Sequence, residues 1–324
     1  MCAVFGLIDY NHVFTTKQRE KLLKVLSREC EIRGTDATGY AFNTKDHLTV
    51  YKRPLAAHKL RLHLKDDANI IMGHTRMATQ GDKSDNRNNH PFSGKVSGTE
   101  FALAHNGVLQ NDCKLRAEMK LPSTPIETDS YIAVQLLENS NALNSQTIAK
   151  MAEKVLGSFV FTILDGKNNM YFVKGDNPLA LYHYESYGFY VYASTKEILD
   201  RALTNLGLLT LPHAEIRATC GDVIRIDSKG KLTCTQFDTT NLNAWDYRCY
   251  MSRRYWREEE EKQETSEISE LKAFATSIGI LEEDIDMLID YGYDPATIEE
   301  LLYYPGDFYE GIYELLGYDY CGEL

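Results

Sequence analysis

Cys2 stands next to the initiating methionine, so removal of Met1 places a thiol and a free α-amine on one residue. A cysteine thiol titrates near ~8.5 and an α-amino group near ~8, so the amine can act as the base for its own side chain. The alternative is packing, because cysteine behaves as a small hydrophobe and the residues that follow are mostly apolar. The position alone leaves both interpretations open.

A second chemical group is Arg76, in the stretch Gly73–Gly81 that follows the apolar Ile70–Met72. An arginine at the end of a strand, beside hydroxyl groups, is suited to binding a carboxylate through two parallel hydrogen bonds. A surface arginine in a turn has the same local pattern. The stretch alone does not separate the two.

A third candidate is the pair Asn106-Gly107, which follows the apolar Leu103-Ala104. Asn-Gly after an apolar run is the strongest short hairpin signal, and by itself it favours a turn. However, an asparagine amide and a glycine N–H can also donate to one oxyanion, as acyl transfer requires.

A fourth candidate, Asp129, stands at a predicted helix start. It could stabilise the helix dipole or receive the ammonium of an amino acid.

The stretch Arg33-Gly34-Thr35-Asp36 invites comparison with a phosphoribosyl-binding loop. Such a loop follows an apolar strand, whereas here a predicted helix ends at Arg28–Glu31. We therefore reject that interpretation. A glycine turn between a helix and a strand is the simpler one.

The elements that must position these groups are mainly short strands. Apolar or alternating runs predict strands at Ala3–Ile8, Gly39–Phe42, Ile70–His74, Phe101–His105, Phe159–Leu164, Met170–Val173, Ala180–Tyr184, Phe189–Tyr192 and Asp222–Ile226. Asp165–Asn169 has the composition of a hairpin turn. Helices are predicted from Thr16, as the cap, to about Cys30, and from Thr128 onward. Strands in runs, with helices between them, predict an α+β layered fold.

The composition limits the compartment and the partners. Seven cysteines lie scattered without paired spacing, which argues against a disulfide framework or a zinc site and favours a cytoplasmic location. No apolar run is long enough for a membrane helix. The chain has a net charge of −12, and residues 258–324 carry 20 acidic and 2 basic side chains. No basic stripe interleaved with aromatics stands out, so we do not expect nucleic-acid binding.

The acidic end of the chain predicts a separate part. We expect a charged linker over 241–265 and an acidic helical module over 266–324, with helices at Ser266–Ile278, Leu281–Tyr291, Pro295–Tyr304 and Phe308–Leu316. Asp294 before Pro295 is a typical helix start. Eight tyrosines lie between Tyr291 and Tyr320, which favours an interface over a solvated cap.

Five motifs occur in one order along the chain: Cys2, Arg33-Gly34-x-Asp36-x-x-Gly39, Gly73-His74-Thr75-Arg76-x-Ala78-Thr79, His105-Asn106-Gly107 and Glu127-Thr128-Asp129. In this order they resemble a class II glutamine amidotransferase domain, a member of the N-terminal nucleophile (Ntn) hydrolases. The nearest likeness is to the glutaminase domain of glucosamine-phosphate synthase. Later stretches, Asp176–Leu179 and Ala193–Lys196, are similar to the closing strands of that domain. The resemblance implies a four-layer αββα sandwich of two antiparallel sheets over residues 2–240.

The resemblance also implies a role for each motif residue. Cys2 would attack the carboxamide of L-glutamine, with its own α-amine as base, to form a γ-glutamyl thioester and release ammonia. Asn106 and Gly107 would form the oxyanion hole. Substrate contacts would come from Arg76 for the α-carboxylate, Asp129 for the α-ammonium, Thr79 for the bound glutamine and Arg33 as support. The resemblance implies no metal and no cofactor.

Three departures from the family pattern concern the surroundings of these groups. Ala3 replaces the usual glycine, Met77 the usual tryptophan and Gln80 a common histidine. None removes a catalytic group, but Met77 and Gln80 put coupling to an acceptor in doubt.

About 90 residues follow the glutaminase-like region, too few for the usual acceptor domains. We therefore expect a glutaminase subunit whose ammonia acceptor is a partner protein, docked through the acidic module. Two alternatives stay open: a cysteine amidohydrolase of another amide without ammonia transfer, and a catalytically silent regulatory or scaffold subunit.

Overall fold

The computed structural model of the chain describes residues 2–45, 47–242, 267–290, 293–303 and 308. Its internal contacts divide the chain into two units, Met1–Asp246 and Tyr247–Leu324, which are described separately.

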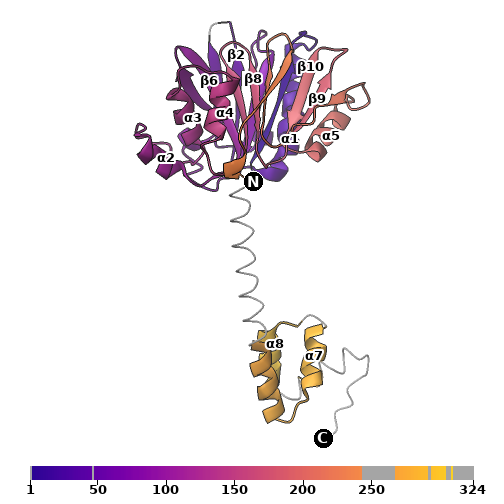
Figure 1. Ribbon diagram of the computed structural model, residues 1–324. Helices are drawn as coiled ribbons and strands as arrows, with labels where there is room; N and C mark the ends of the chain where they lie inside the picture. Colours follow the sequence, from indigo (N-terminus) through magenta and orange to yellow (C-terminus); the bar gives the residue numbers. More distant parts are fainter. Residues whose placement is uncertain (1, 46, 243–266, 291–292, 304–307, 309–324) are drawn as a thin grey trace. The chain divides into compact units, whose positions relative to one another are not determined.

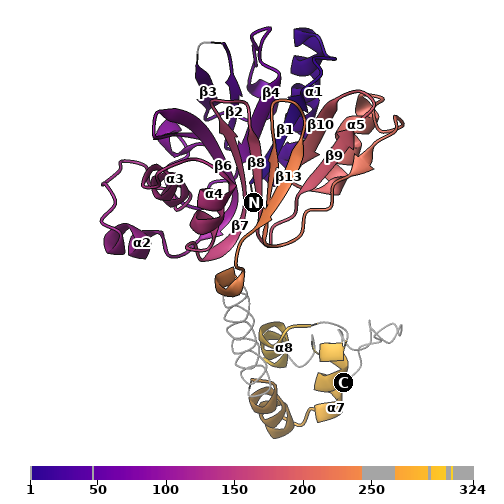
Figure 2. The same cartoon turned by 45° about the horizontal axis from the view of Figure 1, so that its top comes forward.

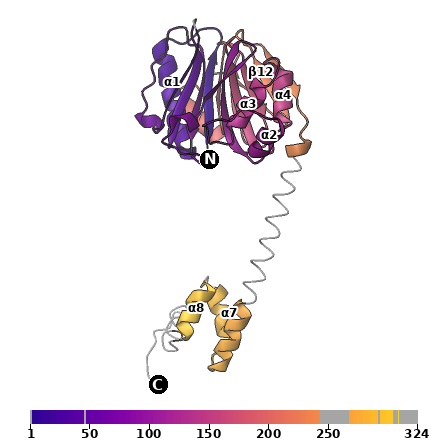
Figure 3. The ribbon, with the colours of Figure 1, turned by 90° about the vertical axis from the view of Figure 1, so that its left-hand side faces the viewer.

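The first unit contains two antiparallel sheets that lie face to face (Figures 1 and 3). The first sheet has the order β11-β9-β10-β1-β4-β2-β3. Its strands are β1 (Ala3–Asp9), β2 (Ala37–Asn43), β3 (Leu48–Arg53), β4 (Ile70–Arg76), β9 (Ala180–Tyr184), β10 (Phe189–Ala193) and β11 (Ala214–Glu215). The second sheet has the order β13-β12-β8-β7-β6-β5. Its strands are β5 (Phe92–Val96), β6 (Thr99–Leu109), β7 (Gly157–Asp165), β8 (Met170–Lys174), β12 (Asp222–Ile226) and β13 (Leu232–Gln236).

Helices cover the outer face of each sheet, which makes four layers (Figure 3). Helices α1 (Thr16–Glu29) and α5 (Lys196–Asn205) pack their apolar faces on the first sheet. Helices α2 (Asp112–Glu118), α3 (Tyr131–Glu138) and α4 (Ser145–Ala152) cover the second. Short 3-10 helices occur at Cys30–Arg33, Ala57–Lys59 and Asn86–Asn88. The expected αββα sandwich is therefore confirmed.

Three apolar clusters follow from these layers. Alternate residues of each strand point to opposite faces, so β1 sends Phe5 and Leu7 toward α1 and sends Val4 and Ile8 between the sheets. The cluster between the sheets joins β1 to Ala104 of β6. The outer cluster of the second sheet packs against α3 and α4.

All nine predicted strands exist, and several extend by one to four residues at an end. The four strands that the sequence did not reveal, β3, β5, β11 and β13, are the outermost strands of the two sheets. Edge strands are half solvated and lack apolar runs, as the exposed and half-buried residues of β3 and β13 show. Helices α2, α4 and α5 were also missed. The cap of α1 is Thr15 rather than Thr16, because its side chain accepts the Gln18 N–H.

The second unit contains helices at 267–277, α7 (Glu282–Asp290) and α8 (Pro295–Leu302) around a small apolar core. Asp294 caps α8 through the Thr297 N–H, as its sequence predicts. A groove of about 540 Å³ is lined by Glu267, Glu270, Leu271, Phe274, Pro295, Ala296, Glu299 and Tyr303. Most of the expected linker 241–265, the helix expected at Phe308–Leu316 apart from Phe308, and six of the eight tyrosines lie outside the described residues.

Candidate functional site

Cys2 lies directly before β1, which runs between β10 and β4 (Figure 2). The Met77 N–H points at the Cys2 sulfur over 3.4 Å. Arg33 Nε donates to the Cys2 carbonyl oxygen over 2.8 Å. Two of the predicted motifs, those of Arg33 and of Met77, therefore meet at Cys2.

The electrostatic surroundings of the thiol involve the two charged residues expected to bind substrate. Burial raises the pKa of the Cys2 thiol above its ordinary value. The Met77 N–H and the positive charge of Arg76 lower that pKa, and the negative charge of Asp129 raises it. Strands β1 and β4 pair up to Ala3 opposite Thr75, so Cys2 and Arg76 lie directly beyond the same end of this ladder.

Asn106 and Gly107 lie inside β6, opposite Val160 and Phe159 of β7. The hairpin turn that the local sequence favours is therefore wrong. Gly107 has a φ of +147°, which an L side chain rarely adopts, and a Cβ there would collide with the Ser158 carbonyl. The pairing with β7 overrides the turn preference, and the glycine is needed for close approach of the two strands.

The side chain of Asn106 is linked to β1, the strand that follows Cys2, through the hydroxyl of Ser194. Asn106 Nδ2 donates to Ser194 Oγ over 3.4 Å, and that oxygen also accepts the Val4 N–H over 2.8 Å. Asn106 and Ser194 are buried. One serine hydroxyl therefore connects the candidate oxyanion donor to β1.

Asp129 lies beside the end of β6, two residues before α3. Its Oδ2 accepts the Leu109 N–H over 2.5 Å, and its Oδ1 accepts the Ser130 hydroxyl over 3.4 Å. The carboxylate is almost completely buried. Leu109 is two residues from Gly107, so the carboxylate and the candidate oxyanion donors share one edge of β6.

Arg76 is the last residue of β4 and is buried. Its guanidinium donates to Asn89 Oδ1 over 2.8 Å and to the carbonyl oxygens of Gln80 and Gly81 over 2.5 and 3.4 Å. A guanidinium has five N–H donors, so others remain for a ligand. Thr79 lies exposed on the loop that follows Arg76.

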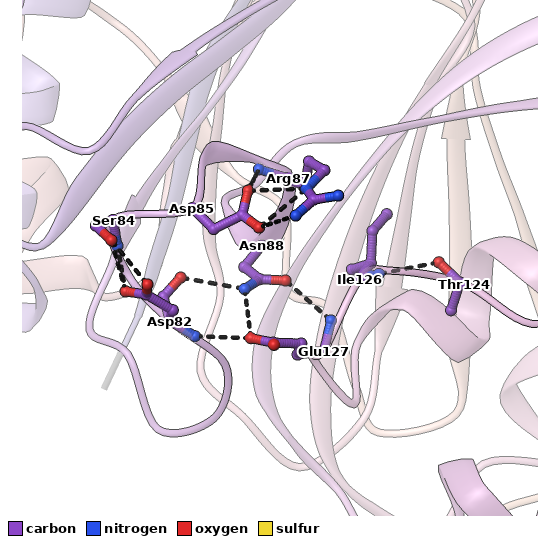
Figure 4. Close-up of polar contacts among 8 residues, drawn as sticks. All are labelled: Asp82, Ser84, Asp85, Arg87, Asn88, Thr124, Ile126 and Glu127. Atoms are coloured by element: carbon purple, nitrogen blue, oxygen red, sulfur yellow. Dashed lines mark hydrogen bonds and ion pairs between the residues drawn. The ribbon is translucent and has the colours of Figure 1, made fainter.

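The loop 77–85 is tied to the body by two carboxylates. Asp36 accepts the Ala78 N–H and the Lys83 ammonium, both over 2.9 Å. Glu127 Oε2 accepts the Asp82 N–H over 3.0 Å and Asn88 Nδ2 over 2.9 Å, and the Glu127 N–H donates to Asn88 Oδ1 over 2.9 Å (Figure 4). The acidic residues of two motifs thus hold the loop that carries Thr79 and Gln80.

Three histidines close in sequence or space to the candidate site residues are buried: His74, His90 and His105. His74 Nε2 donates to the His105 carbonyl over 3.0 Å, and the His74 and His90 rings lie 4.2 Å apart. Burial lowers the pKa of His74 to about 3 and lowers those of His90 and His105. All three imidazoles are therefore neutral near pH 7.

Sequence reasoning assigned no role to Ser194 or to Asn177, whose side chain binds the Asn106 carbonyl. Both lie in stretches that resemble the closing strands of the family. Their contacts lie 88 and 71 residues away in sequence, so no local pattern could reveal them. Within the described part of the chain, no group of three or more His, Cys, Asp or Glu residues could hold a metal ion. No helix there is long and apolar enough to cross a membrane.

Comparison with known proteins identifies the domain. Residues 74–201 match the glutamine amidotransferase domain family. The chain is 30% identical over 271 residues to glutamine–fructose-6-phosphate aminotransferase (isomerizing) of Staphylococcus aureus strain Mu50, covering 78% of this chain and 42% of that protein. The Staphylococcus epidermidis (strain ATCC 35984) protein of the same name is 30% identical over 256 residues, covering 76% and 40%. The chain thus spans less than half the length of these relatives.

Solved structures show the same fold. Glutamine phosphoribosylpyrophosphate amidotransferase from B. subtilis superposes with a TM-score of 0.57 at 20% identity, covering 74% of this chain and 50% of that chain. A structure described as the allosteric regulatory enzyme of purine biosynthesis gives 0.59 at 19% identity, with the same coverage. These likenesses show the fold, and the match of residues 74–201 places this part of the chain in the glutamine amidotransferase domain family.

Proposed function

We propose that this chain hydrolyses L-glutamine with Cys2 as nucleophile and supplies the ammonia to an acceptor on another polypeptide. The observation that carries the proposal is the position of the charged groups around Cys2: Arg76 follows Thr75 where the β1–β4 ladder ends at Ala3, and Asp129 accepts the Leu109 N–H two residues from Gly107. A cation and an anion beside one thiol match the carboxylate and ammonium of a free α-amino acid.

We infer the following reaction. Arg76 and Asp129 bind the α-carboxylate and the α-ammonium, Thr79 contacts the substrate, and Arg33 holds the Cys2 carbonyl. After removal of Met1, the α-amine of Cys2 takes the thiol proton and the sulfur attacks the carboxamide carbon. Asn106 Nδ2 and Gly107 N–H bind the oxyanion. The proton passes to the leaving nitrogen as ammonia departs, and water then cleaves the γ-glutamyl thioester to glutamate.

Release of glutamate from glutamine, compared between the wild type and Cys2→Ala, tests the hydrolysis. We expect turnover by the wild type and none by the variant, with an intact mass that shows loss of Met1. Equal rates in the two proteins, or retention of Met1 in an active protein, would remove Cys2 as an N-terminal nucleophile.

The partner is proposed from the second unit. Its groove presents the apolar Leu271, the half-exposed Phe274 and the exposed Tyr303 beside Glu270 and Glu299. Among the described residues that line it, none is a lysine or an arginine. We propose that it binds a segment of the acceptor protein that combines apolar anchors with lysine or arginine, because opposite charges on the two surfaces favour and orient association.

A fluorescent amphipathic helix of leucine and lysine serves as the probe for this groove. Anisotropy titration of the full chain should show binding that weakens at least tenfold in Glu270→Lys/Glu299→Lys. The control Glu283→Lys, on the first turn of α7, should bind as the wild type does. Equal affinity for a probe with glutamate in place of lysine would contradict the proposed partner chemistry.

A further inference from the structure

The direction of the Gly107 N–H depends on the peptide plane that it shares with the Asn106 carbonyl. A trans peptide is planar, and its C=O and N–H bonds point in opposite directions. Any group that fixes the Asn106 oxygen therefore also fixes the direction of the Gly107 N–H, which is one of the two proposed oxyanion donors.

Asn177 provides such a group. Its Nδ2 donates to the Asn106 carbonyl oxygen over 2.9 Å, across 71 residues of sequence. The same amide lies against the α-carbon of Gly107, because a Cβ on Gly107 would be only 2.8 Å from Asn177 Nδ2. The side chain of Asn177 thus contacts both residues of the Asn106–Gly107 peptide.

Asn177 is held in place by the strand that pairs with Gly107. Asp176 Oδ1 accepts the Phe159 N–H over 2.9 Å, and the Gly175 N–H donates to the Phe159 carbonyl over 3.1 Å. Phe159 is the register partner of Gly107. The residues that precede Asn177 are therefore tied to β7 at the level of the oxyanion donors, and Pro178 restricts the backbone that follows.

We propose that Asn177 is a positioning residue, which clamps the Asn106–Gly107 peptide so that the Gly107 N–H faces the oxygen of the reacting amide. This inference rests on the proposed function. It divides the oxyanion hole between two anchors: Ser194 holds the Asn106 side chain, and Asn177 holds the peptide that carries the backbone donor. Asn177 itself does not touch the reacting atoms.

The sequence allows a direct measurement of this peptide. Asn106-Gly107 is the only Asn-Gly pair in the chain. Labelling with carbonyl-13C asparagine and 15N glycine therefore gives one correlated NMR signal, from the Asn106 carbonyl and the Gly107 N–H. We expect this signal to shift in Asn177→Ala and Asn177→Asp, because both lose the donor to the Asn106 oxygen. It should not move in Asn205→Ala, an exposed asparagine on α5.

Kinetics then separates positioning from a general structural role. Loss of a whole oxyanion donor lowers kcat about 10²- to 10³-fold, so a misdirected donor in Asn177→Ala should lower kcat roughly tenfold. The KM for glutamine should stay within about twofold, because Arg76 and Asp129 are untouched. Alkylation of Cys2 by iodoacetamide should keep its wild-type rate, because that displacement forms no oxyanion.

Two results would overturn the inference. One is an unmoved NMR signal together with wild-type kcat in both Asn177 variants. The other is a fall in kcat accompanied by an equal fall in alkylation rate and in melting temperature, which would indicate a structural role. If the wild type releases no glutamate but the signal still shifts, the clamp is present and the proposed function is wrong.

Discussion

Ser194 Oγ accepts the Val4 N–H over 2.8 Å, although 190 residues separate the two in sequence. Strand β10 pairs with β1 up to Ala193 opposite Phe5, so the Val4 N–H lies one residue beyond that ladder. The serine side chain supplies the acceptor that the strand no longer provides. Since Asn106 also donates to this hydroxyl, β1 and β6 are held together where Cys2 enters the sheet.

Ser194→Ala tests this connection through stability. Ser194 is fully buried, so the variant leaves the Val4 N–H without its partner and should lose about 1–3 kcal/mol of unfolding free energy. Urea unfolding measures the loss. Ser93→Ala, at an exposed position of β5, should change stability by less than about 0.5 kcal/mol. A loss of that small size at Ser194 would contradict the role given to its hydroxyl.

Gly107→Ala should destabilise the protein more than Gly98→Ala. Both glycines have a positive φ, but a Cβ at Gly98 meets no atom within 4 Å, whereas at Gly107 it would collide with Ser158. Backbone strain alone costs about 1–2 kcal/mol, which is the loss expected for Gly98→Ala. Thermal unfolding should show at least twice that loss for Gly107→Ala. Similar losses at both positions would mean that β6 and β7 adjust freely around the site.

Glu127→Ala should raise the KM for glutamine roughly three- to tenfold, with kcat close to the wild type. The variant removes the hydrogen bond from the Asp82 N–H of loop 77–85 and one from Asn88, whose amide also donates to the Asp82 carbonyl; each contributes about 0.5–1.5 kcal/mol. Glu127→Gln keeps one acceptor oxygen and should have a smaller effect. Glu118→Ala, on the exposed face of α2, is the control. Unchanged KM in Glu127→Ala would show that the loop needs no such anchor.

The buried histidines predict how stability depends on pH. The pKa of His74 is about 3 in the folded chain and near 6.5 in the unfolded chain, so unfolding takes up a proton between these values. The free energy of unfolding should therefore fall as the pH drops below about 6.5, by up to about 1.4 kcal/mol per pH unit for each such imidazole. His90 and His105 act in the same direction.

Urea unfolding between pH 4 and 8 measures this dependence. His90→Asn removes one of these imidazoles, so its stability should fall less steeply with decreasing pH than that of the wild type. Ser93→Ala, at an exposed position of β5, removes no titratable group and should leave the slope unchanged. A wild-type slope in His90→Asn would contradict the assignment of His90 as a neutral buried group.

The reactivity of Cys2 should report the charges around it. Burial raises the pKa of the thiol, so alkylation by iodoacetamide should increase with pH through a midpoint above that of a free cysteine. Arg76→Gln removes a positive charge and should move the midpoint up, whereas Asp129→Asn should move it down. Shifts in the opposite directions, or none, would place the two residues away from the sulfur.

The sequence revealed the interior strands but not the edge strands. The nine predicted strands all lie inside their sheets, where apolar side chains form recognisable runs. The edge strands β3, β5, β11 and β13 lack such runs because water covers part of each. The turn propensity of Asn106-Gly107 predicted a hairpin turn, but the pair lies within β6 because β6 pairs with β7 there.

The site could be predicted as a set of groups but not as an arrangement. The motif order predicts Cys2, Arg76 and Asp129 as site residues, and the structure places Cys2 and Arg76 directly beyond the paired residues Ala3 and Thr75. The supporting residues Ser194 and Asn177 could not be found this way, because their partners depend on the register of strands far apart in sequence. The sequence also did not predict that the Arg76 guanidinium donates hydrogen bonds to Asn89 and to carbonyl oxygens of the loop.

Strand β6 carries the proposed oxyanion donors and pairs with β7 from Phe101 to Leu109. The loop 77–85, by contrast, is held by hydrogen bonds to the carboxylates of Asp36 and Glu127. The two parts meet at Cys2, because the Met77 N–H of the loop points at its sulfur. The departures Met77 and Gln80 both fall in the loop, and neither falls in the ladder. New sequences between Ala78 and Asn86 can therefore vary the loop while leaving the β6–β7 ladder and the Met77 contact with Cys2 in place.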